Sequence, residues 1–104
     1  MPWTVKALNP QGAGWKLTLH GIVGPESYDT TTGVVYPVPN CHEVVDAMVT
    51  SETCGYLTFD VSADGKNVYF HICDLRQPTP KELSAGTDAS GLKFKVFSYA
   101  RYNA

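Results

Sequence analysis

The feature that most constrains the fold is an alternation of apolar and polar residues, repeated along the chain and interrupted by turn-forming residues. Successive side chains of a β-strand point to opposite faces, so this alternation is typical of strands with one buried face. It is clearest in segments 57–62 and 67–72, which are separated by Asp64-Gly65. Asp-Gly favours the positive φ angles of a tight hairpin turn. The pattern therefore predicts a hairpin whose apolar residues share one core: Leu57, Phe59, Val61, Val68, Phe70 and Ile72.

Similar alternation predicts strands at 3–7, 15–23, 34–36 and 92–102. Segment 42–50 is ambiguous, because apolar residues on both of its faces suit either a central strand or two turns of helix. We favour a strand, since β-branched residues dominate it and no helix cap precedes it. In the polar connection 77–91, Thr79-Pro80-Lys81-Glu82 resembles a capping box with proline at the first helical position, which predicts one short helical turn.

Together these elements predict an all-β fold: a single antiparallel β-sandwich or barrel of six to seven strands with one short helical turn. A chain of 104 residues has room for one domain, and we expect residues 1–104 to form it.

Composition and charge narrow the classes of partner. The net charge of −2 and the scattered basic residues argue against nucleic acid as a partner. No apolar run reaches the roughly 18 residues of a membrane span, so no membrane partner is expected. No signal peptide is recognisable, which predicts synthesis in a cytoplasm with three reduced cysteines. A charged fraction of 17% with 12% aromatic residues suggests a surface suited to protein contacts.

Two patterns resemble metal sites, one for zinc and one for calcium, but in both a role without a metal is favoured. Cys41-His42, Cys54 and His71-Ile72-Cys73 contain zinc ligand types, but no C-x-x-C knuckle occurs, so packing roles are expected. Asp60-Val61-Ser62-Ala63-Asp64-Gly65 imitates the start of a calcium loop, but His71 stands where the loop needs glutamate. We expect no metal and no cofactor.

No catalytic centre can be assembled from the sequence, which lacks the G-x-S-x-G, G-x-G-x-x-G and Walker motifs. A binding or structural module is therefore favoured over an enzyme. The alternative is a small β-barrel that binds a ligand or catalyses in its mouth, with His42, His71 and Asp74 as convergent polar groups.

The last predicted strand provides the best candidate for a protein interface. If Leu92, Phe94 and Val96 face the core, then Phe97, Tyr99 and Arg101 point outward. Tyrosine and arginine are enriched in interface hot spots. The other reading is that loop 24–40 of the same chain covers this face. The expected contact residues are Phe97, Tyr99, Arg101 and Tyr102, with Tyr28 and Tyr36 from the loop region.

The order of segments resembles a class of small structural proteins of tailed bacteriophages. The resemblance rests on Trp3-Thr4-Val5 at the start, the Thr/Gly-rich loop Tyr28-Asp29-Thr30-Thr31-Thr32-Gly33, and the valine-rich segment Val44-Val45-Asp46-Ala47-Met48-Val49. A hairpin, a Gly/Ser/Thr-rich loop and a final strand follow. The long connection 77–91 and the three cysteines depart from that layout.

The resemblance implies a virion protein that decorates or cements a capsid shell by bridging capsid subunits. Its partner would be the major capsid protein or another virion protein, and its place would be the capsid surface. A closed homo-oligomer is expected, with a trimer favoured because shells offer threefold sites. A tail or fibre adhesin module is the alternative of the same class.

Overall fold

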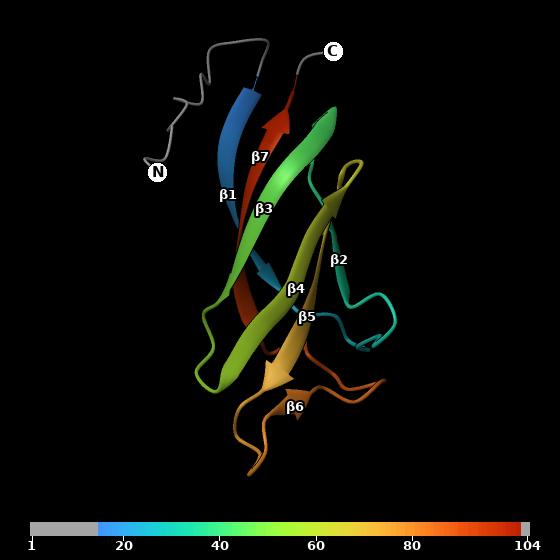
Figure 1. Cartoon of the computed structure of the whole chain (residues 1–104), viewed down its shortest axis with the longest axis vertical. Coiled ribbons are helices and arrows are strands. Elements are labelled where there is room, and N and C mark those ends of the chain that lie inside the picture. Colours follow the sequence, from blue (N-terminus) through green and yellow to red (C-terminus); the bar gives the residue numbers. More distant parts are fainter. Residues whose placement is uncertain (1–14, 103–104) are drawn as a thin grey trace, which may run out of the picture.

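The computed structural model describes residues 15–102, which form an all-β structure of two antiparallel sheets (Figure 1). One sheet has three strands in the order β1-β7-β3, and the other has the order β2-β5-β4, with the short β6 also paired to β5. The predicted all-β sandwich is confirmed. The strands are β1 (Trp15–Val23), β2 (Val34–Pro37), β3 (Glu43–Ser51), β4 (Tyr56–Asp64), β5 (Asn67–Asp74), β6 (Lys81–Glu82) and β7 (Lys93–Arg101). The strand predicted at 3–7 lies outside the described residues.

The ambiguous segment 42–50 is a strand, β3, as predicted. It pairs with β7 across its length, with a register shift between Val44 and Asp46. Val44 and Val49 are buried, whereas Val45 at the irregularity is exposed. The bulge therefore explains why Val44 and Val49 are both buried although they are five residues apart, and Met48 adds an exposed apolar side chain on the outer side.

The helical turn predicted at Thr79–Glu82 is wrong. Residues 15–102 contain no helix, and Lys81 and Glu82 instead pair with Asp74 and Cys73 of β5. A capping box favours a helix start, but Gly86 leaves too few residues for a stable helix. Pairing with β5 satisfies the backbone polar groups of this short segment.

One core fills the space between the sheets. Phe70 of β5 and Phe94 of β7 are both fully buried, and their ring centroids lie 5.1 Å apart. Segment 83–92 closes one end, because Leu83 and Ala89 are buried there and contribute to the same cluster. The core thus joins the hairpin to the last strand.

The hairpin is confirmed, but two of its six predicted core residues, Leu57 and Phe59, are not in the core. Val68, Phe70 and Ile72 are fully buried, whereas Leu57 and Phe59 are 52% and 39% exposed. Leu57 and Phe59 pair with Cys73 and His71, which alternate with the buried residues of β5.

A bulge explains this error. The register of β4 shifts between Phe59 and Ser62, and Asp60 in that interval has a φ of 55°. The extra residue exchanges the two faces of the strand, so Val61 and Ala63 pack against the core while Leu57 and Phe59 do not. The two-residue turn follows Asp64, with Gly65 at a φ of 62°.

Candidate functional site

The outer side of the three-stranded sheet is the first candidate site. Phe94, Val96, Ser98 and Ala100 of the central strand β7 are fully buried. The alternating residues Phe97, Tyr99 and Arg101 therefore point away from the core, as predicted, and they remain partly exposed.

Both neighbouring strands add apolar side chains to this surface. In β1, Leu17 lies opposite Tyr99 and Leu19 opposite Phe97. In β3, Met48 lies opposite Phe97 from the other side. The exposed fractions of Leu17, Leu19 and Met48 are 68%, 52% and 55%, so loop 24–40 does not cover them. We call this surface the apolar face and define it by Trp15, Leu17, Leu19, Met48, Phe97 and Tyr99.

Aromatic and charged contacts hold one end of the apolar face in place. The rings of Trp15 and Tyr99 stack with centroids 5.2 Å apart and an interplanar angle of 15°. The Arg101 guanidinium lies 5.8 Å from the Trp15 ring centroid, and its Nη2 lies 3.5 Å from Oε1 of Glu43. A shallow hollow beside Met48 is lined by Leu17, Asp46, Ala47, Phe97 and Tyr99. Side chains ordered in this way lose little conformational freedom when a partner binds.

The three other predicted contact tyrosines do not lie on this face. Tyr28 is only 1% exposed, so its side chain is unavailable as a contact of the folded chain, which corrects the prediction. Tyr36 and Tyr102 pack against the core cluster from the inner side. The Tyr36 ring lies 5.7 Å from that of His20, and the Tyr102 hydroxyl lies 3.4 Å from Thr18 Oγ1.

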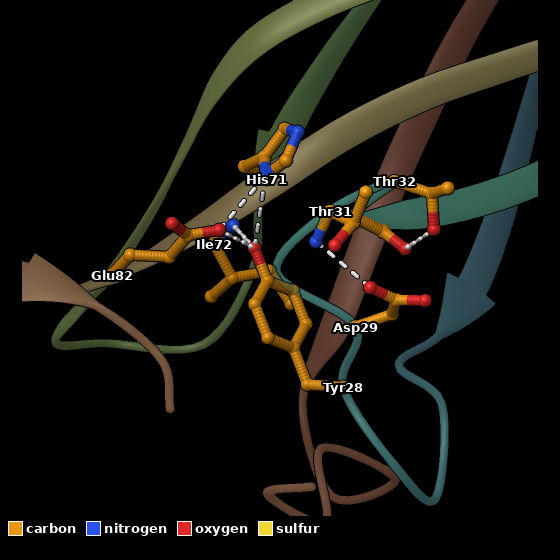
Figure 2. A network of polar contacts seen from close by, with 8 residues as sticks. Tyr28, Asp29, Thr31, Thr32, His71, Ile72 and Glu82 are labelled. Carbon is orange, nitrogen blue, oxygen red and sulfur yellow. Dashed lines mark hydrogen bonds and ion pairs between the residues drawn. The ribbon is translucent and has the colours of Figure 1, made fainter. Parts of the chain in front are cut away.

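A second candidate is the polar cluster around Tyr28, shown in Figure 2. The Tyr28 hydroxyl donates to Glu82 Oε2 at 2.6 Å and accepts from the backbone N–H of Ile72 at 2.9 Å. His71 Nδ1 lies 2.8 Å from the same carboxylate oxygen. A carboxylate only accepts, so Nδ1 carries the hydrogen of this bond.

The cluster fixes the loop between β1 and β2 against β5 and β6. Burial, followed by the bond to Glu82, raises the pKa of Tyr28 far above its usual range, so the phenol stays protonated. The bonds from Tyr28 and then His71 lower the pKa of Glu82. Backbone bonds from Tyr28 N to Thr87 O and from Gly86 N to Tyr28 O strengthen the same junction. The arrangement suits a structural clamp, since every polar atom named here is engaged within the chain.

Replacing Glu82 with glutamine tests this clamp. We expect a loss of about 1–2 kcal/mol in the free energy of unfolding at pH 7, because charge-assisted bonds at a partly exposed site are lost. A carboxyl whose pKa is lowered by folding stabilises the fold above its unfolded pKa and loses that contribution as the pH falls. The difference between parent and variant should therefore shrink below about pH 4.

Urea denaturation at pH 7 and at lower pH measures this difference. Glu26→Gln is the matched control, because Glu26 is exposed in the loop between β1 and β2 that carries Tyr28, and its replacement should change stability little. A difference between parent and Glu82→Gln that grows on acidification would contradict the clamp.

The residues named for a ligand-binding or catalytic mouth do not converge. His42 is exposed just before β3, while His71 and Asp74 point to opposite faces of β5. A polar hollow of about 240 Å³ beside β6 includes Asp74, but Arg76 binds this carboxylate through its backbone N–H, Nε and Nη2. The bonds from Arg76 lower the pKa of Asp74 to about 2. The hollow therefore offers no free carboxylate at Asp74 for a ligand.

The possible metal ligands are also spread apart. Cys41 is buried and donates to Val38 O at 3.4 Å, Cys54 is exposed, and Cys73 is intermediate. Among residues 15–102, no group of three or more His, Cys, Asp and Glu side chains is placed to hold a metal ion. Asp60 and Asp64 belong to the hairpin strand β4 rather than to a loop between helices. In the same part of the chain, no helix has the length and apolar character needed to cross a membrane.

Comparison of the chain with family models, with curated proteins and with solved structures gave no match.

The sequence predicted only two of the six residues of the apolar face. Phe97 and Tyr99 on β7 were identified, but not Trp15, Leu17, Leu19 and Met48 beside them. The alternation in segment 15–23 was visible, yet the polar residues Thr18 and His20 occupy the inner side of β1 opposite Ser98 and Val96. Ser98 offers a sequence signal for the orientation of β1. A small polar residue on the buried side of β7 needs a polar neighbour, and Thr18 provides it, with the two hydroxyls 2.9 Å apart.

Proposed function

We propose that this chain is a non-enzymatic structural component of a virus particle, most specifically a decoration or cement protein that bridges capsid subunits. The observation that carries the proposal is the apolar face, an ordered surface of exposed large side chains on a small protein. Contiguous exposed apolar surface of this kind marks interaction sites in soluble proteins. The layout resembling phage structural proteins selects the virion among possible assemblies.

The proposed mechanism depends on area and repetition rather than on bond chemistry. A protein that binds only the assembled shell stabilises the shell by mass action. Several linked copies strengthen weak individual contacts when their spacing matches the spacing on the shell. The low charged fraction of 17% suits contacts between uncharged surfaces.

Cosedimentation tests this proposal. Shells assembled from the major capsid protein of the same genome are mixed with the purified chain, and we expect saturable binding with a fixed ratio of copies. Bound shells should also resist heat better than bare shells, as linkage requires. Shells mixed with an unrelated β-sandwich domain are the control. Absence of binding to shells, or binding to purified tails instead, would remove the capsid assignment.

A further inference from the structure

We propose that the apolar face pairs with the same face of a second copy of this chain, related to the first by a two-fold axis. The inference deepens the proposed function, and it rests on that function only in placing the chain within a protein assembly.

The dimensions of the sheet set the expected strength of the pair. Strands of nine residues are about 30 Å long, and three adjacent strands are about 14 Å wide. Two such faces would bury roughly 800–900 Å² in total, which is below the range of stable interfaces and within that of weak, transient ones. Association is therefore expected to be weak and to depend on protein concentration.

The charges on the outer side of the sheet differ between its two ends. Lys93 and Lys95 occupy the start of β7, while Glu43 and Asp46 of β3 lie beside its end, opposite Arg101 and Tyr99. Lys95 Nζ lies 3.8 Å from Glu52 Oε2, and Glu43 is paired with Arg101. Within residues 15–102, Lys93 and Asp46 make no ion pair. One cation and one anion thus remain at opposite ends of the apolar face.

This charge pattern is self-complementary in one orientation. Asp46 lies level with Tyr99, about 20 Å along β7 from Lys93. Consider a two-fold axis that lies between the two faces, at right angles to the strands and level with Val96. The strands of the second copy then run in the opposite direction to those of the first. Lys93 of each copy lies over Asp46 of the other, and the apolar side chains meet between these pairs. An axis parallel to the strands would instead bring Lys93 over Lys93, which is unfavourable.

The pairing also decides between the expected trimer and a dimer. A surface patch that meets an identical patch does so about a two-fold axis, whereas a ring of three copies joins two different patches. The inference therefore replaces the trimer expected from shell symmetry with a dimer. In this dimer the apolar face serves the assembly by joining two copies, and the direct contacts with the shell come from other surfaces, such as the loops and the outer side of the four-stranded sheet.

Sedimentation equilibrium of the purified chain over a wide range of concentrations tests the pairing. We expect a monomer–dimer equilibrium that Leu17→Thr combined with Met48→Thr weakens by roughly tenfold or more, because apolar contact area is lost. Threonine keeps a high strand propensity, so the fold should be retained. Leu57→Thr is the matched control: Leu57 is exposed on the outer side of the other sheet, and its replacement should leave the equilibrium unchanged.

Charge reversal tests the orientation. Lys93→Glu and Asp46→Lys should each weaken the dimer, and the two changes together should restore it, since opposite charges again face each other. Asp46 Oδ1 also accepts from Ala47 N at 2.9 Å, so the melting temperature of each variant is measured as a check on folding. Two outcomes would overturn the antiparallel arrangement. Either the single variants dimerise as strongly as the parent, or the double variant dimerises more weakly than each single variant.

The result is separable from the capsid assignment. A parent that is monomeric at every concentration, or a closed trimer, overturns the pairing of apolar faces even if it binds shells. A parent that dimerises through this face but binds no shell keeps the pairing and removes the capsid assignment. Retention of the parent dimer in Leu17→Thr/Met48→Thr would show that another surface mediates self-association, and would also overturn the inference.

Discussion

Replacing Phe70 with alanine is expected to lower the free energy of unfolding by about 3–5 kcal/mol. Phe70 is fully buried in β5, and its ring packs against that of Phe94 from the opposite sheet. Alanine would leave a cavity in the layer that joins the two sheets, and a packed core relaxes only partly around such a cavity. Chemical denaturation monitored by tryptophan fluorescence and by circular dichroism measures the loss.

Phe59→Ala is the matched control, because it removes the same side chain from the outer side of the same hairpin. Phe59 is 39% exposed, and its ring lies 5.4 Å from that of His71. Its replacement should cost about 1 kcal/mol, the typical effect of a point substitution. Equal losses for Phe59→Ala and Phe70→Ala would contradict the bulge at Asp60, because that bulge is what places Phe59 outside the core.

Replacing Gly33 with alanine is expected to cost about 2–5 kcal/mol, from backbone strain and overpacking together. Gly33 has a φ of 72°, in the left-handed region that residues with a Cβ seldom adopt. An added Cβ would also lie 2.3 Å from the carbonyl oxygen of Phe70, so the backbone of β5 would have to move. Thermal unfolding measures the effect, and loosening of loop 24–33 should appear as faster hydrogen exchange there.

Two other glycines separate the two contributions. Gly65 has a φ of 62° but open space around the added Cβ, so Gly65→Ala should cost about 1–2 kcal/mol from backbone strain alone. Gly21 on β1 has open space and no positive φ, so alanine there should be neutral or stabilise by about 0.5 kcal/mol. If Gly33→Ala and Gly65→Ala lose the same stability, or Gly33→Ala loses less, then the close contact of residue 33 with Phe70 is absent.

The sequence by itself determined where the strands are. Alternation located β1, β2, β4, β5 and β7, and Asp64-Gly65 marked the hairpin turn, because strand periodicity and turn conformation depend on neighbouring residues. The same local logic placed Phe97, Tyr99 and Arg101 on one side of β7, opposite the buried Phe94 and Val96. That part of the candidate interface needed no knowledge of the other strands.

The tertiary structure alone decided which side of β1 and of the first part of β4 is buried. An alternating pattern is unchanged when its two faces are exchanged, so the sequence of 15–23 did not reveal that Leu17 and Leu19 point outward. One extra residue at Asp60 then reversed the faces of β4, which placed Leu57 and Phe59 outside the core. The residues of the apolar face on β1, namely Trp15, Leu17 and Leu19, could not be predicted because the alternation in β1 does not show which side is buried.

The tertiary structure also decided the conformation or burial of segments whose local sequence preference was weak. Lys81 and Glu82 have a sequence typical of a helix start, but pairing with β5 holds them in a strand. Tyr28 lies in a polar segment that reads as an exposed loop, yet its hydroxyl contacts Ile72, His71 and Glu82, which are distant in sequence. Short segments gain little from local hydrogen bonding, so long-range pairing and burial determine their conformation.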